Sequence, residues 1–539
     1  MVLGVAAWII FSIVAAPGFG TTDVYLFRDA ACNLLNGAGF TTASFEHSTS
    51  FQPLLYSSYT PLTQWVFLPF AAIFHNGLTA ATAYDFIVAL ISEFAVVWLL
   101  TERLPAGKLR MFAILTVVLT LPVGYLGVEP ERPEPITFFL LLVLLLQLRG
   151  ASNTSRVAMC GFLGGLAFLA EPAGGVMAAF LVGGAIVLPL LTPASKNVRR
   201  AVVLSLVSAI GFFAPIAVTI AAFQHQDSQS VARFIRQATV GGLNRRQAVP
   251  EQLGTQIGSG TQGPALTAPQ AGSKYVEALR FFKSTGPLVL GIELAMIPVV
   301  LTWLFLALKS RGTLAQRAAL LLLGMVFFVA VFVVFPLQGN YLILARCLFP
   351  FVLLANWAGC RSALRWARAV EAIAIYNLVL LLPGLVLVTL QRVEGLDSYR
   401  QAEQQASSLK SYLAAHGAES GVVLVPHGQY YLYKQDLPRL FNPAYLSPEL
   451  DFRQVVAIAD CQTATHFTRP AEMPLPEGVD PSRFTLIEPA GKPVEITLFG
   501  QRVMSRNWTW TCDIYVAGPG PIATRSIFPL SLRGIPFQY

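Results

Sequence analysis

The chain has 539 residues, of which 55% are hydrophobic and only 12% are charged, and its mean hydropathy is +0.59. Soluble domains carry about 25% charged residues, so this composition excludes an ordinary soluble protein and predicts that most of the chain meets lipid. The net charge of +8 comes from basic residues spread along the chain, which excludes a nucleic-acid-binding protein with a clustered basic face.

Apolar runs long enough to cross a bilayer recur up to residue 391. From them we predict about eleven membrane-spanning helices, near residues 1–17, 79–101, 111–128, 135–149, 158–171, 174–192, 201–223, 286–307, 317–336, 342–359 and 369–391. Residues 1–17 lack the basic n-region of a signal peptide, so we expect an uncleaved first helix. The run Leu62–Phe74 is too short and follows a proline-rich turn, which predicts an interfacial helix rather than a span.

The basic residues test this choice of spans. The loops 102–110, 149–157, 193–200, 308–317 and 360–368 would all lie on one side and hold 14 basic residues against one acid, Glu102. Basic excess marks the cytoplasmic side, so the N-terminus is predicted to be cytoplasmic. Residues 18–78, the loop at 129–134, the Gln-, Gly-, Ser- and Thr-rich loop 224–285 and everything after about 392 are then extracytoplasmic.

After about residue 392, the long apolar runs give way to the patterns of an amphipathic helix and short strands. Ser398–Ala415 predicts an amphipathic helix that Gly417 ends. Strands are predicted over 422–426, 455–458, 484–487, 494–499 and 508–516. The fold class that we expect is therefore a polytopic α-helical membrane protein, with a transmembrane unit over 1–392 and a small extracytoplasmic α/β domain over 393–539.

Six cysteines are spread through the chain without metal-ligand spacing. In an oxidising compartment, Cys461 and Cys512 either form a disulfide or remain as two buried thiols.

Ionisable residues at the outer ends of predicted spans are the candidates for chemistry. Asp23 stands where the chain leaves the first span, as a carboxylate facing a lipid-bordered cavity or as the N-cap of the next helix. Glu129, Glu131, Arg132 and Glu134 crowd the exit of another span, either as part of a site or as a solvated loop.

Further candidates lie elsewhere along the chain. Arg346 is placed some turns inside a predicted span, where its natural partner is a phosphate or a carboxylate. Glu171, at a span end, either pairs with an arginine or marks the point where the helix surfaces. Tyr56, Tyr59 and Trp65 lie at the predicted membrane surface, where amphipathic aromatics gather in any case.

Over roughly residues 1–360 these segments, in order and spacing, resemble the GT-C glycosyltransferases, the superfamily of the protein O-mannosyltransferases and the lipid A aminoarabinose transferase. The matching features are an Asp and Tyr followed by an LL-x-G-x-G-aromatic turn, a Tyr-x-x-Tyr-x-Pro-Leu segment, a second acidic position about 100 residues on, and an Arg-Tyr-x-x-Pro segment. Here they are Asp23 with Tyr25, Leu34–Phe40, Tyr56–Leu62, Glu134 and the stretch ARCLFPF, where Cys347 replaces the Tyr. Two further departures are a Glu at the second acidic position, which is usually Asp in the aminoarabinose branch, and Glu171, where relatives often carry a basic residue.

The resemblance implies transfer of a sugar, usually with inversion, from a polyprenyl-phosphate donor to an acceptor hydroxyl at the outer face of a bacterial inner membrane. It makes Asp23 the general base and Glu134 the second catalytic carboxylate. The donor contacts that we expect with it are Arg132, Arg346, Tyr59 and Glu131. Lipid, glycan and protein acceptors all stay open. A divalent cation held by Glu129, Glu131 and Glu134 also stays open, and no other cofactor is expected.

The main alternative is a transporter or lipid-linked-sugar flippase without chemistry. Such a protein would show repeated halves and broken helices at the midplane, but the sequence shows no repeat and the acids gather at the outer face. A non-enzymatic scaffold or receptor that presents the C-terminal domain is the second alternative, and it leaves the acidic loops unexplained.

Overall fold

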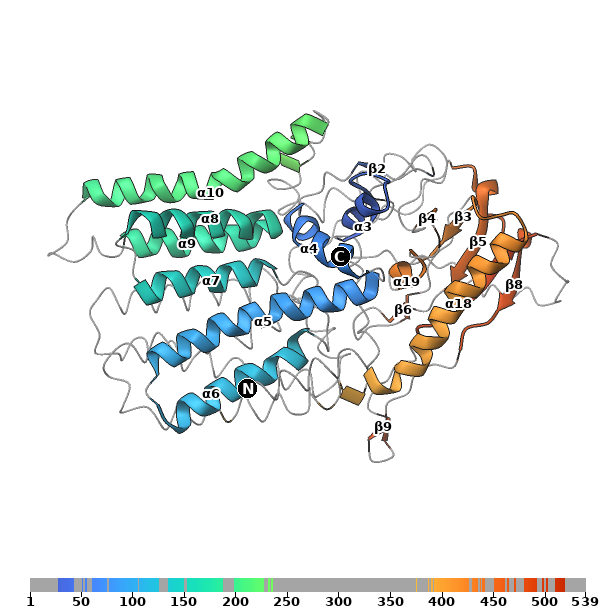
Figure 1. Ribbon diagram of the computed structural model, residues 1–539, viewed down its shortest axis with the longest axis horizontal. Coiled ribbons are helices and arrows are strands. Elements are labelled where there is room, and N and C mark those ends of the chain that lie inside the picture. The colour runs from blue at the N-terminus through green and yellow to red at the C-terminus, as the bar shows by residue number, and fades with distance from the viewer. Residues whose placement is uncertain are drawn as a thin grey trace, which may run out of the picture.

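A layer of long helices lies on one side of the molecule, a sheet with its covering helix lies on the other, and short elements lie between them (Figure 1). The computed structural model describes residues 28–42, 51, 54–55, 61–74, 77–104, 106–125, 134–149, 153–187, 198–226, 231–232, 234–235, 375, 386, 389–390, 392–425, 429–434, 437, 439–441, 450–460, 463–464, 470–471, 479–491, 497–498, 501–502 and 509–518. The spans predicted at 1–17, 286–307, 317–336, 342–359 and most of 369–391 lie outside these residues, as does most of the loop 224–285.

Helices are present at six of the predicted spans: α5 (Gly77–Arg103), α6 (Lys108–Tyr125), α7 (Glu134–Arg149), α8 (Thr154–Ala170), α9 (Pro172–Val187) and α10 (Val198–Gln226). Within the described residues, two segments are long and apolar enough to cross a membrane by length and composition, Thr79–Arg103 and Val198–His225. Shorter apolar helices cover Pro61–Ile73, Thr137–Leu146, Thr154–Ala170 and Gly174–Val187. The total of about eleven spans therefore stays a prediction.

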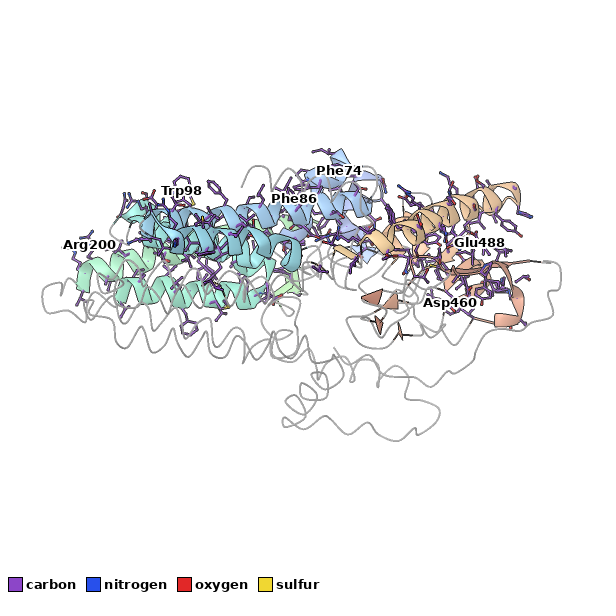
Figure 2. All side chains as sticks on the ribbon, turned by 90° about the horizontal axis from the view of Figure 1, so that it is seen from below. Phe74, Phe86, Trp98, Arg200, Asp460 and Glu488 are labelled. Carbon is purple, nitrogen blue, oxygen red and sulfur yellow. The ribbon has the colours of Figure 1, made fainter. Side chains whose placement is uncertain are left out.

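The outer surface of the helix layer is apolar. On α10, the exposed fractions are 60% for Leu206, 70% for Ile210 and 71% for Val218. A large exposed apolar surface is costly in water, whereas a lipid-facing helix requires one. Figure 2 shows Arg200 at one end of the layer, while Asp460 and Glu488 lie at the opposite end of the molecule. The basic end of α10 therefore lies far from the C-terminal sheet.

Helices α8 and α10 approach each other closely at glycines. A Cβ added at Gly161 would collide with the carbonyl oxygen of Ser208, and one added at Gly165 would collide with that of Phe212. Small residues of this kind allow the backbones of membrane helices to touch.

Two short helices, α3 (Asp29–Leu35) and α4 (Pro61–Ile73), lie between the layer and the sheet. Helix α4 is the run predicted to be interfacial, and Pro61 suits its first turn because that position needs no N–H donor. Gln64 and Phe67 on one face are buried, while Trp65 and Ile73 are exposed. One face therefore packs inward and an apolar face remains outside, as in a helix at a membrane surface.

The C-terminal part contains a five-stranded sheet in the order β4-β3-β5-β11-β8. These strands are β3 (Val422–Leu424), β4 (Leu440–Phe441), β5 (Val455–Asp460), β8 (Phe484–Glu488) and β11 (Asp513–Ala517). Strand β3 pairs in parallel with β4 and β5, whereas β11 is antiparallel to both β5 and β8. Two-residue strands form three further hairpin-like pairs: β1 (Thr41–Thr42) with β2 (Leu54–Leu55), β6 (Thr463–Ala464) with β7 (Pro470–Ala471), and β9 (Thr497–Leu498) with β10 (Gln501–Arg502).

Helix α18 (Leu396–Ala415) confirms the predicted amphipathic helix and its end. Gly417 has φ +65, and the amide of Ala418 donates to the carbonyl of Leu413 at 2.8 Å, which is the bond pattern of a glycine-terminated helix. The buried side of α18 packs with Trp510 and residues of β3, β5 and β11 in one core cluster. A second cluster, which includes Phe452 and Phe484, forms with the same strands.

One strand prediction needs correction, and several short elements were not predicted. The strand expected over 508–516 begins only at Asp513, because Thr509 and Thr511 bond to each other through their side chains at 2.6 Å instead of joining the sheet. Of the strand expected over 494–499, the structure describes only Thr497–Leu498, which form β9. The unpredicted elements are the five-residue helix α19 (Tyr430–Lys434), two short 3-10 turns (Phe452–Gln454 and Pro481–Arg483), and the two-residue strands β1, β2, β4, β6, β7 and β10.

Candidate functional site

Buried ionisable side chains gather where the first residues of α7 and the first turns of α5 meet α3, α4 and α19. We call this set the junction cluster; its members are at most 8% exposed, and they are Arg28, Asp29, Asp85, Glu134, Arg392 and Lys434. Removing charges from water is expensive, so such groups are expected to be paired or to serve a function.

Arg28 is the central cation of the junction cluster. Its Nη2 donates to Oδ1 of Asp85 at 2.5 Å, and the two side chains are 0% and 2% exposed. The guanidinium also lies 4.9 Å from the ring centroid of Tyr84 and 5.4 Å from that of Phe67. These rings attract the cation through their faces and keep water away from the ion pair.

Asp29 is the first residue of α3 and is fully buried. Its Oδ2 accepts from the Thr42 hydroxyl at 3.1 Å and from Nδ2 of Asn33 at 3.4 Å. Its Oδ1 lies 3.7 Å from Nζ of Lys434, the last residue of α19. The C-terminal part thus contributes a charged side chain to the junction cluster.

Glu134, the first residue of α7, differs from the other acids in the cluster. It is 1% exposed, yet neither of its carboxylate oxygens has a hydrogen-bond partner in the part of the chain that the structure describes. Arg28 attracts it electrostatically, and the hydroxyl of Thr63 approaches it without reaching hydrogen-bond geometry. A buried polar group without a partner requires an explanation, of which a ligand or an ordered water is the usual one.

A second polar layer lies deeper along α5 and α7. The hydroxyls of Ser92 and Thr137 lie 2.6 Å apart, and Glu93 beside them is 4% exposed. Carboxylates inside a membrane-spanning helix are rare and commonly functional.

The structure describes only part of the predicted site. Glu134 lies in the junction cluster, four residues of sequence separate Asp23 from Arg28, and the predicted turn contains Gly37 and Gly39 at φ +78 and +74. Both glycines occupy the left-handed region that other residues avoid. Glu171 is half-buried between α8 and α9. The other predicted site residues lie outside the described residues: Asp23, Tyr59, Glu129, Glu131, Arg132, Arg346 and Cys461.

Sequence reasoning missed five members of the junction cluster. The signal for Asp85 was present, because it lies with Glu93 inside the span predicted over 79–101, where an acid is costly. Arg28 and Asp29 lie five and six positions after the proposed base Asp23. Lys434 gives no sequence signal, because its partner lies in a distant segment.

A divalent cation would need more ligands than the described residues supply. They hold no group of three or more His, Cys, Asp or Glu side chains placed to bind a metal. Glu134 itself suits a cation because its oxygens accept no hydrogen bond among those residues, while the other two acids of the predicted set lie outside them.

The described residues include both free and disulfide-bonded cysteines. Cys32 and Cys160 are free thiols there, whereas Cys512 is disulfide-bonded. Cys512 directly precedes β11, whose Asp513 pairs with Asp460 of β5, and the partner expected for it from the sequence, Cys461, lies outside the described residues.

Comparison with known proteins gives few matches. No protein-family model and no curated protein matches the sequence. The structure is similar to crystal structures of the oligosaccharyltransferase of Archaeoglobus fulgidus. One, a complex with Zn and sulfate, has 14% identity and a TM-score of 0.46 over 85% of this chain and 67% of that one. Another, tethered to an acceptor peptide containing the NVT sequon, has 15% identity and a TM-score of 0.47 over 82% of this chain and 64% of that one. The chain thus spans about two thirds of the length of that enzyme, and no residue role is transferred from it.

Proposed function

We propose that the protein is a membrane glycosyltransferase that transfers a sugar from a polyprenyl-phosphate donor to an acceptor hydroxyl at the extracytoplasmic face. One observation carries the proposal: three segments on which the GT-C resemblance depends lie together in space. They are α3 with its glycine turn, α4, which begins within the Tyr56–Leu62 segment, and Glu134 at the start of α7.

The proposed reaction needs a base, a way to stabilise the leaving group and a place for the donor lipid. Asp23 takes the proton from the acceptor hydroxyl as the hydroxyl oxygen attacks the anomeric carbon. The bond between that carbon and the phosphate oxygen breaks, and the polyprenyl phosphate leaves with the electron pair. Arg132 and Arg346 bind the phosphate, because guanidinium groups match phosphate oxygens and stabilise the charge that develops there.

Glu134 acts at the sugar in this scheme. Its unpartnered carboxylate accepts hydrogen bonds from sugar hydroxyls or, together with Glu129 and Glu131, binds a divalent cation beside the phosphate. Tyr59 and Glu131 complete the contacts to the donor. The exposed apolar surface of the helix layer provides the boundary along which a prenyl chain reaches the site.

The proposal places the enzyme in a bacterial inner membrane, with the N-terminus in the cytoplasm and the C-terminal α/β domain, residues 393–539, outside it. The acceptor is a glycan, a lipid or a protein at that face.

The test is a transfer assay in proteoliposomes, with the donor chosen by mass spectrometry of the lipid that co-purifies with the protein. Asp23→Asn and Glu134→Gln should each lower kcat by about 10²–10⁴-fold, the usual contribution of a positioned acid or base. Glu102→Gln, exposed at the other end of α5, is the matched control and should transfer at the wild-type rate. Undiminished transfer by Asp23→Asn would refute its role as base. Movement of the lipid-linked sugar across the vesicle without a new glycosidic bond would support the flippase instead.

A further inference from the structure

We propose that Lys434 of the C-terminal part is a positioning residue for the site: its ion pair with Asp29 holds α3, and with it Arg28, in place. The activity that Lys434 would affect rests on the proposed function. The structural part of the inference does not.

The ion pair joins segments that are far apart in sequence. Nζ of Lys434 lies 3.7 Å from Oδ1 of Asp29, and the two side chains are 7% and 0% exposed. Water screens such a pair little, so its attraction is stronger than that of a surface pair. Because Arg28 directly precedes Asp29, any shift of Asp29 also moves the guanidinium that binds Asp85.

A second anchor holds the same outer loop. Phe51 is 6% exposed within the C-terminal core and makes edge contacts with the rings of Phe441 and Phe452 at 5.6 and 5.9 Å. Nη2 of Arg439 also donates to the carbonyl of Phe51 at 3.4 Å. The C-terminal part therefore contacts this loop at Phe51 as well as at α3, where Lys434 supplies the charged contact.

Cys32, one turn into α3, lies between the C-terminal part and the helices α4 and α5. It packs against the core cluster of the C-terminal part and against the cluster of α4 and α5 that includes Phe67 and Tyr84. Burial, and after it the negative charge of Asp29, raise the pKa of the Cys32 thiol to about 12. Thiolate is the reactive form, so Cys32 should react slowly with maleimide while α3 is held in place.

Cys32 therefore reports on the position of α3 without any need for an activity. Lys434 lowers the pKa of this thiol, so losing its charge alone would raise the pKa and slow labelling. Movement of α3 would expose the thiol and accelerate labelling. The two effects have opposite signs, so the direction of the change shows whether Lys434 positions the helix.

The experiment compares Lys434→Met, Lys434→Gln and Lys434→Arg in the full-length protein, with Lys410→Met on the exposed face of α18 as control. Labelling is measured by mass spectrometry of the peptide that contains Cys32. Lys434→Met should raise the labelling rate about 10-fold or more, the factor that about 1.4 kcal/mol of easier opening produces. Lys434→Gln, which keeps a donor for Asp29 and folds more readily, should raise it in the same direction.

The transfer assay supplies the second readout. Because a misplacement of about 1 Å costs on the order of 100-fold in rate, Lys434→Met should lower kcat by about 10–100-fold. Lys434→Arg should restore both labelling and kcat towards wild type, and Lys410→Met should change neither. Unchanged or slower labelling in Lys434→Met and Lys434→Gln would overturn the proposal, as would failure of Lys434→Arg to restore protection. If the wild-type protein transfers no sugar, the proposed function fails while the labelling result still decides the role of Lys434.

Discussion

Two chemically identical substitutions in the junction cluster should change stability in opposite directions. Glu134→Gln and Asp85→Asn each replace a buried carboxylate, 1% and 2% exposed, by its amide. The carboxylate of Asp85 is bonded to Arg28 at 2.5 Å, whereas that of Glu134 accepts no hydrogen bond within the described residues. We expect Asp85→Asn to destabilise the protein and Glu134→Gln to stabilise it.

The size of each change in stability depends on the charges that remain buried after the carboxylate is replaced. Asp85→Asn removes the charge that compensates Arg28, and breaking a buried ion pair costs about 3–5 kcal/mol. Attraction between Arg28 and Glu134 offsets part of that loss, so the lower end of the range is expected. Glu134→Gln removes a desolvated charge without breaking a described bond. Because burying an unpaired charged group costs more than burying an unpaired neutral amide, the variant should be more stable by about 1–3 kcal/mol.

The assay is the thermal unfolding midpoint in one detergent at pH 8, followed by tryptophan fluorescence, with the Glu102→Gln protein as an exposed control. Wild type should fall between the two variants. A lower midpoint for Glu134→Gln would mean that its carboxylate is paired in the folded protein, and the reasoning would be refuted. Combined with lost transfer, a higher midpoint would identify Glu134 as a residue kept for activity at the expense of stability.

Two further predictions concern packing and covalent structure. Gly161→Val should force α8 and α10 apart and destabilise the protein by about 1–3 kcal/mol. The control Gly183→Val, where an added Cβ meets no atom within 4 Å, should leave the thermal unfolding midpoint unchanged. Equal effects of the two substitutions would contradict the close approach of α8 to α10. Peptides containing Cys461 and Cys512 should be linked in a non-reducing digest, because Cys512 is disulfide-bonded. Cys461→Ser should release Cys512 as a free thiol, and a different partner for Cys512 would contradict the pairing expected from the sequence.

Periodicity and apolar runs predicted those elements whose signal is local. The six helices of the layer, the interfacial helix α4 and the amphipathic helix α18 each carry a continuous pattern, because one face or all faces of the helix must meet an apolar environment. Gly417 marked the end of α18 correctly, because glycine readily adopts the left-handed conformation that ends a helix. The proline-rich turn before Leu62 marked the start of α4 to within one residue. Short elements such as α19 and β4 have too few residues to show a period.

The junction cluster was harder to predict because it depends on tertiary contacts. Glu134 and the glycine turn carried the resemblance, so a sequence match could identify them. The pairing of Arg28 with Asp85 depends on how α3 packs on α5, and the pairing of Lys434 with Asp29 depends on where the C-terminal part docks. Asp85 could have been selected from its place in a predicted span, but only its geometry separates it from Glu93.

The junction cluster lies where the helix layer, helix α4 and the C-terminal part meet. The helix layer supplies Asp85 and Glu134, the C-terminal part supplies Lys434, and α4 lies between them. Gln64 of α4 accepts from the amide of Ala31 at 2.9 Å.

The opposite face of α4 exposes Trp65 and Ile73 to the predicted membrane surface. The proposed function brings a lipid-linked donor to this point from the bilayer and a polar acceptor from outside. The proposed chemistry needs both at once, so a site formed by a membrane helix pair, an interfacial helix and an extramembrane domain suits it better than a site enclosed by the helix layer alone.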